Sequence, residues 1–297
     1  MDLWRALKGK LRFSERLSAH TSFKIGGRAS VLFEPKDVKD LKRCLQGLKK
    51  YKIPYFLIGN GTNLLIKDCG FDGMVIKLCS PAFKRISRKG NIITVASGAS
   101  IQSLLKYLSR TRLSGYEFLA GIPGTIAGAL AMNAGTIIEG KKKNIGDIAY
   151  KLKVLNKRGE IKDLSKRECG FAYRKSSLDK YIVLKAELKL SKVNVVTKNR
   201  INSLLLYRKE HQDYSKPNAG CIFKNPSRHV SAGKLIEDCG LKGLRYGGAM
   251  ISNKHANFIL NFNRATANDV IKLINIAKRR VKNRFGVTLK EEIKIVS

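Results

Sequence analysis

Apolar residues recur at the spacing of an amphipathic helix in four stretches of the chain. The first covers residues 37–50, with an aspartate as a good N-cap residue. The second begins after Ser100, and Gly115 marks where it stops. The third runs over about residues 198–212. The last opens at Thr266, with an aspartate at the capping-box position and a glycine at its end, which predicts a well-bounded helix.

Short apolar runs between these helices indicate strands. They cover residues 55–58, 64–66, 74–76 and 92–97, several segments before Leu190, and a closing stretch at 287–296. Helices mixed with many short strands, without an internal repeat, predict an α+β fold. The pattern changes near residues 191–200, so we expect one domain at 1–195 and a second at 196–297.

Two glycine-rich segments are the first candidates for ligand binding. Gly59–Asn63 reads GNGTN, but no helix follows it, which argues against a classical dinucleotide fingerprint. The turn could approach a phosphate closely or could equally be a tight strand connection. Ala120–Gly135 combines four glycines with a proline in an apolar stretch, which favours backbone packed against a flat or phosphorylated ligand over a tight small-residue helix.

Charge and composition narrow the classes of function. Lys and Arg number 59 against 22 Asp and Glu, but the cations are spread along the chain without a basic tail. We interpret this as a solvated surface that also attracts anionic substrates, and we expect no obligate nucleic acid partner. The N-terminus lacks the apolar stretch of a signal peptide and no run is long enough for a membrane span, so we expect a cytoplasmic protein. The six cysteines are scattered without a metal-ligand spacing, so we expect no metal site.

Seven motifs, in order along nearly the whole chain, resemble the UDP-N-acetylenolpyruvoylglucosamine reductase family. They are HTSFKIGGRA (20–29), IGNGTN (58–63), GIPGTIAGALAMNAG (121–135), YRKS (173–176), AGCIFKNP (219–226), the run AGKLIEDCGLKGLRYGGAMISNKHANFI (232–259) and GVTLKEEI (286–293). The chain resembles the shorter type of the family, which lacks an extra loop with a substrate-covering tyrosine.

The resemblance implies an FAD-binding domain of the vanillyl-alcohol-oxidase type at 1–195, followed by a smaller substrate-binding domain. It implies that NADPH reduces a non-covalent FAD, and that hydride then passes to the enolpyruvyl group of UDP-N-acetylglucosamine enolpyruvate. The product is UDP-N-acetylmuramate, a peptidoglycan precursor. We expect the enzyme to be a monomer.

The resemblance also implies three catalytic residues. Arg174 lies beside the enolpyruvyl carboxylate, for which a guanidinium is a suitable partner. Cys221 stands where the best-known members have a serine that protonates the substrate, and a thiol is the stronger acid. Glu292 matches the family's glutamate, whereas strict strand alternation would point Glu291 inward; a bulge would reconcile the two, and we choose Glu292.

The remaining site residues follow from the same motifs. The predicted cofactor-binding residues are Gly59, Asn60, Gly61, Thr62, Asn63, Gly121, Ile122, Pro123, Gly124, Thr125, Gly128, Asn133 and Gly135. The predicted substrate-binding residues are Tyr173, Lys224, Asn225 and His255. The main alternative is an FAD-dependent oxidase of the same fold, acting on an alcohol or sugar, in which His20 would be the candidate for covalent flavin attachment.

Overall fold

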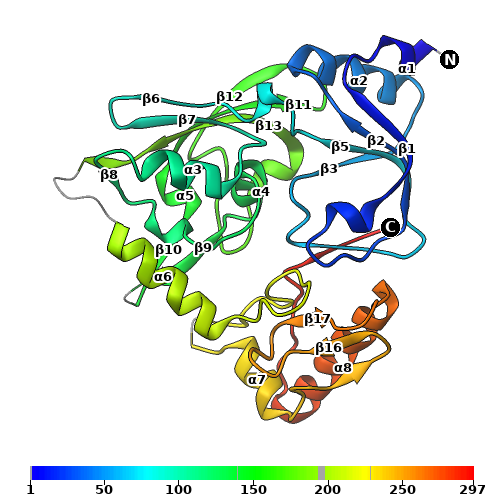
Figure 1. Cartoon of the computed structure of the whole chain (residues 1–297), viewed down its shortest axis with the longest axis vertical. Coiled ribbons are helices and arrows are strands. Elements are labelled where there is room, and N and C mark those ends of the chain that lie inside the picture. The colour runs from blue at the N-terminus through cyan, green and yellow to red at the C-terminus, as the bar shows by residue number, and fades with distance from the viewer. Residues whose placement is uncertain (1, 139, 193–197, 228) are drawn as a thin grey trace. The chain divides into compact units, whose positions relative to one another are not determined.

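The computed structural model describes residues 2–138, 140–192, 198–227 and 229–297 (Figure 1). The α-helices are α1 (Asp2–Ala6), α2 (Val38–Lys50), α3 (Ile101–Leu108), α4 (Ile126–Ala131), α5 (Ile145–Ile148), α6 (Lys198–His211), α7 (Ala232–Asp238) and α8 (Ala267–Phe285). The 3-10 helices are η1 (Leu17–His20), η2 (Pro81–Phe83), η3 (Glu117–Leu119) and η4 (Ser177–Lys180).

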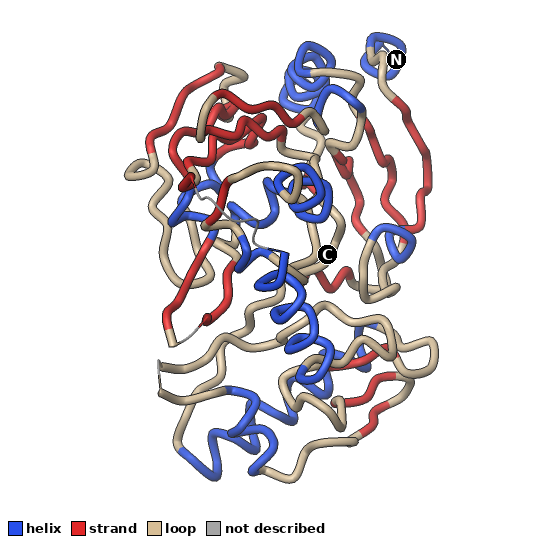
Figure 2. The backbone as a smooth tube through the Cα atoms, turned by 60° about the vertical axis from the view of Figure 1, so that its left-hand side comes forward, coloured by secondary structure: helices blue, strands red, loops and turns tan. Residues whose placement is uncertain are grey.

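The strands are mostly short and alternate with the helices (Figure 2). They are β1 (Lys10–Arg16), β2 (Arg28–Glu34), β3 (Tyr55–Ile58), β4 (Leu64–Ile66), β5 (Phe71–Lys77), β6 (Ile86–Lys89), β7 (Ile92–Ala96), β8 (Leu113–Ser114), β9 (Gly135–Ile138), β10 (Lys141–Asn144), β11 (Ala149–Asn156), β12 (Ile161–Ser165), β13 (Tyr181–Lys189), β14 (Ser191–Lys192), β15 (Arg245–Tyr246), β16 (Ala249–Ile251), β17 (Ile259–Asn261) and β18 (Lys294–Val296). This content confirms the predicted α+β class.

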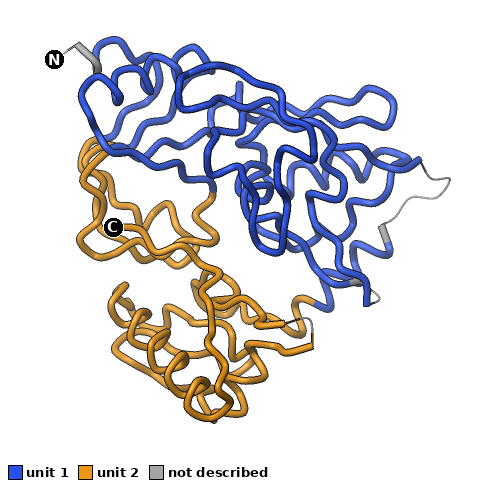
Figure 3. Tube along the Cα trace, turned by 180° about the vertical axis from the view of Figure 1, so that it is seen from behind, with its two compact units in different colours: residues 1–12, 32–59, 74–207 blue, residues 13–31, 60–73, 208–297 orange. Residues whose placement is uncertain are grey.

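The chain forms two compact units that interleave along the sequence (Figure 3). Unit 1 comprises residues 1–12, 32–59 and 74–207, and unit 2 comprises 13–31, 60–73 and 208–297. The boundary predicted between residues 195 and 196 lies outside the described residues and stays a prediction.

Unit 1 is built around a five-stranded antiparallel sheet in the order β12-β11-β13-β7-β6. Leu152 and Ala186 from two of its strands are fully buried together with Leu104 of α3 and Leu130 of α4. Their burial forms one apolar core that supports the loops between β7 and α4. Helix α2 belongs to the same unit, and the Asp37 side chain caps it by accepting from Asp40 N–H, as predicted.

Unit 2 is organised by α8 and the small sheet β15-β16-β17. Thr266 and Asp269 form the predicted capping box at the start of α8, and Gly286 ends the helix in the left-handed conformation at φ 70°. The buried face of the helix packs into a core with strands β16 and β17 and with residues 219–223. This core fixes the segment that carries Cys221.

Two of the predicted boundaries are wrong. The helix that begins after Ser100 ends at Leu108, well before Gly115, and β8 intervenes. The stretch 287–296 is regular strand only at Lys294–Val296, which pairs in parallel with β4. Its earlier part pairs with a different segment, described below. The strands β8 and β18 pair with β14 and β4, which are distant in sequence. A local sequence pattern therefore does not encode where these strands begin and end.

Candidate active site

The two glycine-rich segments approach each other within unit 1. A Cβ at Gly59 would lie 2.6 Å from Thr125 Oγ1, which is too close for any side chain. Thr125 is buried, and its hydroxyl accepts from Gly128 N–H as the N-cap of α4. The absence of a side chain at Gly59 therefore lets this turn pack directly on the start of the second glycine segment.

The second segment is held in an irregular path by backbone bonds. Ile101 N–H donates to the Gly124 carbonyl, and Ile126 N–H donates to the Ala99 carbonyl. Gly121 has φ 72° and Gly124 has φ 123°, conformations that side chains rarely adopt. Ile122 and Pro123 lie between these glycines, just before α4. Two glycines with positive φ within four residues thus fix an irregular backbone path through the residues predicted to bind the cofactor.

Two buried polar atoms beside this segment point to a polar ligand. Among the described residues of unit 1, Ser97 Oγ and Glu117 Oε1 are buried and have no hydrogen-bond partner. The Ser97 carbonyl accepts from Ala127 N–H, and Glu117 lies in η3, which immediately precedes the segment. Unpaired buried polar atoms are costly, so a ligand with hydroxyl or N–H donors would satisfy them. The ribityl and ribose hydroxyls of FAD have this chemistry, so these residues fit FAD.

Arg174 lies at the other end of the same segment. Its guanidinium donates to the carbonyl of Gly135 at 3.2 Å, and its backbone has φ 51°. Left-handed backbone at a non-glycine residue is a sign of a functional position. Tyr173 beside it is 39% exposed, and the Lys142 ammonium lies 3.5 Å from the centroid of its ring. The structure therefore places Tyr173 and Arg174 together next to Gly135.

The buried side chain of Asn133 stabilises the turn that carries Tyr173 and Arg174. It is 5% exposed; its carbonyl oxygen accepts from Gly146 N–H, and its amide donates to the Ala172 carbonyl. Both functional groups of the side chain are thus bonded to backbone within unit 1. Asn133, predicted to bind the cofactor, has contacts that also position the turn carrying Arg174.

In unit 2, Cys221 lies on a short segment with a partner on each side. Cys221 forms an antiparallel bridge with Phe258, and Phe223 forms one with Glu291. Ile222 N–H donates to the Asn257 carbonyl at 2.8 Å. On the opposite edge, Glu292 N–H donates to the Ile222 carbonyl at 2.7 Å. Residues 221–224 therefore act as the middle strand of a small three-stranded arrangement that brings Cys221 and Glu292 onto neighbouring backbones.

The structure gives the Glu291 carboxylate a defined partner. The Glu291 carboxylate pairs with Lys278 Nζ of α8 at 2.8 Å. Burial raises the pKa of Glu291, but the hydrogen bond and charge of Lys278 outweigh it, so that pKa lies below its usual value. The Glu291 carboxylate is therefore held in an ion pair with helix α8.

The rest of the first glycine turn, Asn60–Asn63, belongs to unit 2. A Cβ at Gly61 would lie 2.2 Å from the His20 carbonyl, so this turn also packs tightly. The Asn63 side chain donates to the Glu292 carbonyl at 3.1 Å, and the Asn63 carbonyl accepts from Lys294 N–H. The turn predicted to bind the cofactor is therefore bonded directly to residues 292 and 294 of the C-terminal segment.

The predicted substrate-binding residues of unit 2 flank Cys221 in sequence or in space. Lys224 N–H donates to the Lys290 carbonyl, and the exposed Asn225 accepts from Ala232 N–H at the start of α7. His255 is half-buried, with its ring centroid 4.7 Å from that of Phe258. Its Nδ1 accepts from Asn257 N–H, so a neutral ring carries its proton on Nε2. Burial lowers the pKa of His255 below its ordinary value of 6.5, which keeps it a neutral donor at pH 7.

Sequence reasoning missed Asn257, which makes three hydrogen bonds to residues 222 and 223 of the Cys221 segment. Its amide makes two hydrogen bonds to the backbone of Phe223, at 2.9 and 2.8 Å. Its only sequence signal is its place in the HAN run beside His255. Its partner lies 34 residues away, which no periodicity reveals.

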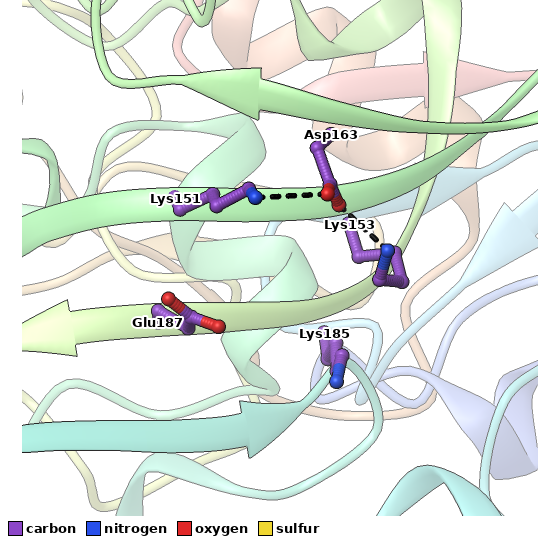
Figure 4. A pocket seen from close by; sticks show the side chains of 5 residues that line it. All are labelled: Lys151, Lys153, Asp163, Lys185 and Glu187. Atoms are coloured by element: carbon purple, nitrogen blue, oxygen red, sulfur yellow. Dashed lines mark ion pairs between the residues drawn. The ribbon is translucent and has the colours of Figure 1, made fainter. Parts of the chain in front are cut away.

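A separate charged cluster lies on the five-stranded sheet of unit 1. Lys151 and Lys153 both pair with Asp163, beside Lys185 and Glu187, and line a small pocket (Figure 4). The two lysines lower the pKa of the exposed Asp163 to about 2. None of the predicted site residues lines this pocket. Among the described residues there is no group of three or more His, Cys, Asp or Glu that could hold a metal ion.

Comparison with known proteins agrees with these features. The model of the UDP-N-acetylenolpyruvoylglucosamine reductase C-terminal domain matches residues 212–296, and an FAD binding domain model matches residues 29–165. The chain is 42% identical to the UDP-N-acetylenolpyruvoylglucosamine reductase of Caldanaerobacter subterraneus subsp. tengcongensis, covering 97% of this chain and 94% of that protein. It is 41% identical to the enzyme of the same name from Clostridioides difficile, with the same coverage. The chain belongs to the UDP-N-acetylenolpyruvoylglucosamine reductase (MurB) family.

Solved structures support the same assignment. The MurB of Thermus caldophilus superimposes with a TM-score of 0.82 at 34% identity, over 98% of this chain and 100% of that one. A Physcomitrella patens BBE-like 1 variant shares the fold alone, with a TM-score of 0.51 at 17% identity over 65% of this chain. These likenesses confirm the predicted FAD-binding domain of the vanillyl-alcohol-oxidase type and an FAD-containing oxidoreductase. Within the part of the chain that the structure describes, no helix is long and apolar enough to cross a membrane.

Proposed function

We propose that this protein is a UDP-N-acetylmuramate dehydrogenase, which reduces the enolpyruvyl double bond of UDP-N-acetylglucosamine enolpyruvate to give UDP-N-acetylmuramate. Bound FAD would supply the hydride for this reduction, with NADPH as the reductant. The product is a precursor of peptidoglycan, so we place the enzyme in cell-wall synthesis, and through it in cell shape and division. We also propose that it acts in the cytoplasm as a monomer.

Residues of unit 1 bind the cofactor and orient the substrate in this proposal. The backbone of Gly121–Gly135, together with Gly59, would hold FAD: a Cβ would clash at Gly59 and at Gly135, and Gly121 and Gly124 have positive φ. Arg174 binds the enolpyruvyl carboxylate. Its guanidinium stabilises the negative charge that moves onto this carboxylate when hydride adds to the distant carbon of the double bond. Tyr173, next to Arg174, also binds the substrate.

Residues of unit 2 complete the reduction. The carbon next to the carboxylate becomes a carbanion and takes a proton from the Cys221 thiol, which leaves a thiolate that solvent reprotonates. One hydride and one proton thus add across the double bond. Glu292 stabilises this proton transfer, either directly or through a water, and Lys224, Asn225 and His255 hold the UDP group. The Lys224 ammonium and the amide and imidazole donors of the other two residues suit a diphosphate.

One observation supports the chemical assignment most strongly. Hydrogen bonds through Ile222 place Cys221 and Glu292 on adjacent backbones, within the region that matches the family's C-terminal domain. Glu292 lies opposite Ile222, so the thiol and the carboxylate come from positions one residue apart across the pairing, and a proton-donating site needs an acid and a polar partner close together.

The function is tested by NADPH oxidation with purified holoenzyme, with and without UDP-N-acetylglucosamine enolpyruvate. We expect substrate-dependent oxidation and a product heavier by two hydrogens. Oxidation that depends only on oxygen, with an alcohol or sugar as the preferred electron donor, would support the oxidase alternative instead. The hydrogen bond of His20 Nε2 with Glu15 at 2.8 Å supports a structural role for His20 over flavin attachment.

A further inference from the structure

We infer that Asn257 is a positioning residue that holds the Cys221 thiol in place for proton transfer; this inference rests on the proposed function. Asn257 is 3% exposed and lies between His255 and Phe258 in unit 2. Its side-chain carbonyl accepts from Phe223 N–H at 2.9 Å, and its side-chain amide donates to the Phe223 carbonyl at 2.8 Å. Its own backbone carbonyl accepts from Ile222 N–H.

The chemistry of these contacts is specific to an amide side chain. The two groups of Phe223 require one acceptor and one donor at the same position, and only asparagine of this size supplies both. Phe223 is 2% exposed, so water cannot replace a lost partner without entering the core. A carboxylate at residue 257 would accept from the N–H but would repel the carbonyl.

The hydrogen bonds of Asn257 affect the position of Cys221 because residues 221–224 are hydrogen-bonded on both edges. On one edge, residues 222–224 are bonded to residues 290–292. On the other edge, the hydrogen bonds are to Asn257, next to the bridge between Cys221 and Phe258. Loss of the amide therefore removes two hydrogen bonds from one edge of the strand, two residues from Cys221, and leaves that edge with the Ile222 backbone bond and the bridge between Cys221 and Phe258. The edge that carries Glu292 stays bonded.

A shift of this kind affects one step of the reaction selectively. Proton transfer needs the donor within hydrogen-bond reach of its acceptor, so small displacements of Sγ slow it steeply. Reduction of the flavin by NADPH does not use this proton. Asn257 variants should therefore slow the oxidation of reduced flavin by the UDP-sugar and leave its reduction unchanged.

Asn261 provides a matched control in the same unit. Its amide donates to the Phe23 carbonyl, and its oxygen accepts from Ala265 N–H, so it also joins distant backbones with two hydrogen bonds. Neither partner belongs to the Cys221 segment. Comparison of Asn257→Ala with Asn261→Ala separates a specific effect on Cys221 from a general loss of stability.

The experiment measures both half-reactions by anaerobic stopped flow on holoenzyme carrying Asn257→Ala, Asn257→Asp or Asn261→Ala. For both Asn257 variants we expect flavin oxidation to slow about 10-fold or more and flavin reduction to stay within about twofold of wild type. Asn261→Ala should leave both rates within about twofold. In a Cys221→Ala background, Asn257→Ala should cause no further slowing, because both changes affect one step.

A second measurement does not depend on turnover. The alkylation rate of Cys221 relative to Cys239, followed by mass spectrometry, should change in the Asn257 variants and not in Asn261→Ala. Wild-type flavin oxidation in folded Asn257 variants, or effects that multiply with those of Cys221→Ala, would overturn the positioning role while the proposed function stands. A wild-type turnover rate in Cys221→Ala would contradict both the assignment of Cys221 as proton donor and the positioning role of Asn257.

Discussion

The two units hold their candidate functional residues by opposite means. In unit 1 the cofactor segment depends on missing side chains: Gly59 packs on Thr125, and Gly121 and Gly124 adopt left-handed backbone. In unit 2 the reactive residues sit on extended backbone that is hydrogen-bonded on both edges, around residues 221–224. Substitution in the first region should therefore remove a ligand, and substitution in the second should change a rate.

Gly124→Val should have the largest effect. A β-branched residue cannot adopt φ 123° without strain, and Gly124 is buried. We expect purified protein with little or no flavin, measured by absorbance after acid release. The capped helix α8 belongs to unit 2, so limited proteolysis should still leave residues 212–296 resistant. A variant that retains equimolar flavin would contradict the role of this segment.

Glu292→Gln and Glu291→Gln should differ strongly in rate. The Glu291 carboxylate is already paired with Lys278, whereas Glu292 is assigned to proton transfer. Glu292→Gln should slow flavin oxidation by about 10²-fold, and Glu291→Gln by less than about threefold. The same half-reaction assay measures both. The reverse order would show that strand alternation, with Glu291 facing the substrate, was the better guide.

His255 should cause a moderate dependence of stability on pH. Its pKa in the folded protein lies below 6.5, so the unfolded chain takes up the proton first as pH falls. Its contribution to stability is present above pH 6.5 and is lost as pH falls through the folded pKa. His255→Gln should flatten the decline in melting temperature of unit 2 between about pH 7 and pH 5, relative to wild type. An identical decline in both proteins would assign it to other groups.

Asp163→Asn should have the smallest effect. Although Lys151 and Lys153 hold the pKa of Asp163 at about 2, the group is fully exposed and solvent screens both ion pairs. We expect kcat/KM and flavin content equal to wild type. A change in either would show that this face of the sheet communicates with the cofactor segment.

The sequence predicted those parts of the fold that local signals encode. Helix α8 was predicted to the residue because Thr266, Asp269 and Gly286 are local caps. Helix α3 was extended too far because Gly115 resembles a stop signal, although the chain leaves the helix at Ser109. The strand at 287–296 was predicted as one element because its alternation is continuous. Its two halves in fact pair with different, distant partners.

In the candidate site, too, the sequence predicted only what local motifs encode. The glycines, Arg174, Cys221 and Glu292 were predicted from motifs, since each belongs to a recognisable local run. The contacts of Asn257 with Phe223, and of Asn63 with Glu292, join positions far apart in sequence. The inclusion of residues 13–31 and 60–73 in unit 2 has the same cause. These contacts and the composition of unit 2 depend on hydrogen bonds between segments that are distant in sequence, which a local sequence pattern does not predict.

The most direct test of the account is the oxidation of NADPH-reduced flavin by UDP-N-acetylglucosamine enolpyruvate in wild type, Cys221→Ala and Cys221→Ser. The account predicts rapid oxidation in wild type, slowing by about 10²–10⁴-fold in Cys221→Ala, and recovery of a large part of the rate in Cys221→Ser. Flavin reduction by NADPH should be nearly equal in all three. Reduced wild-type flavin that the UDP-sugar fails to oxidise would contradict the proposed function, and a wild-type rate in Cys221→Ala would contradict the proton donor.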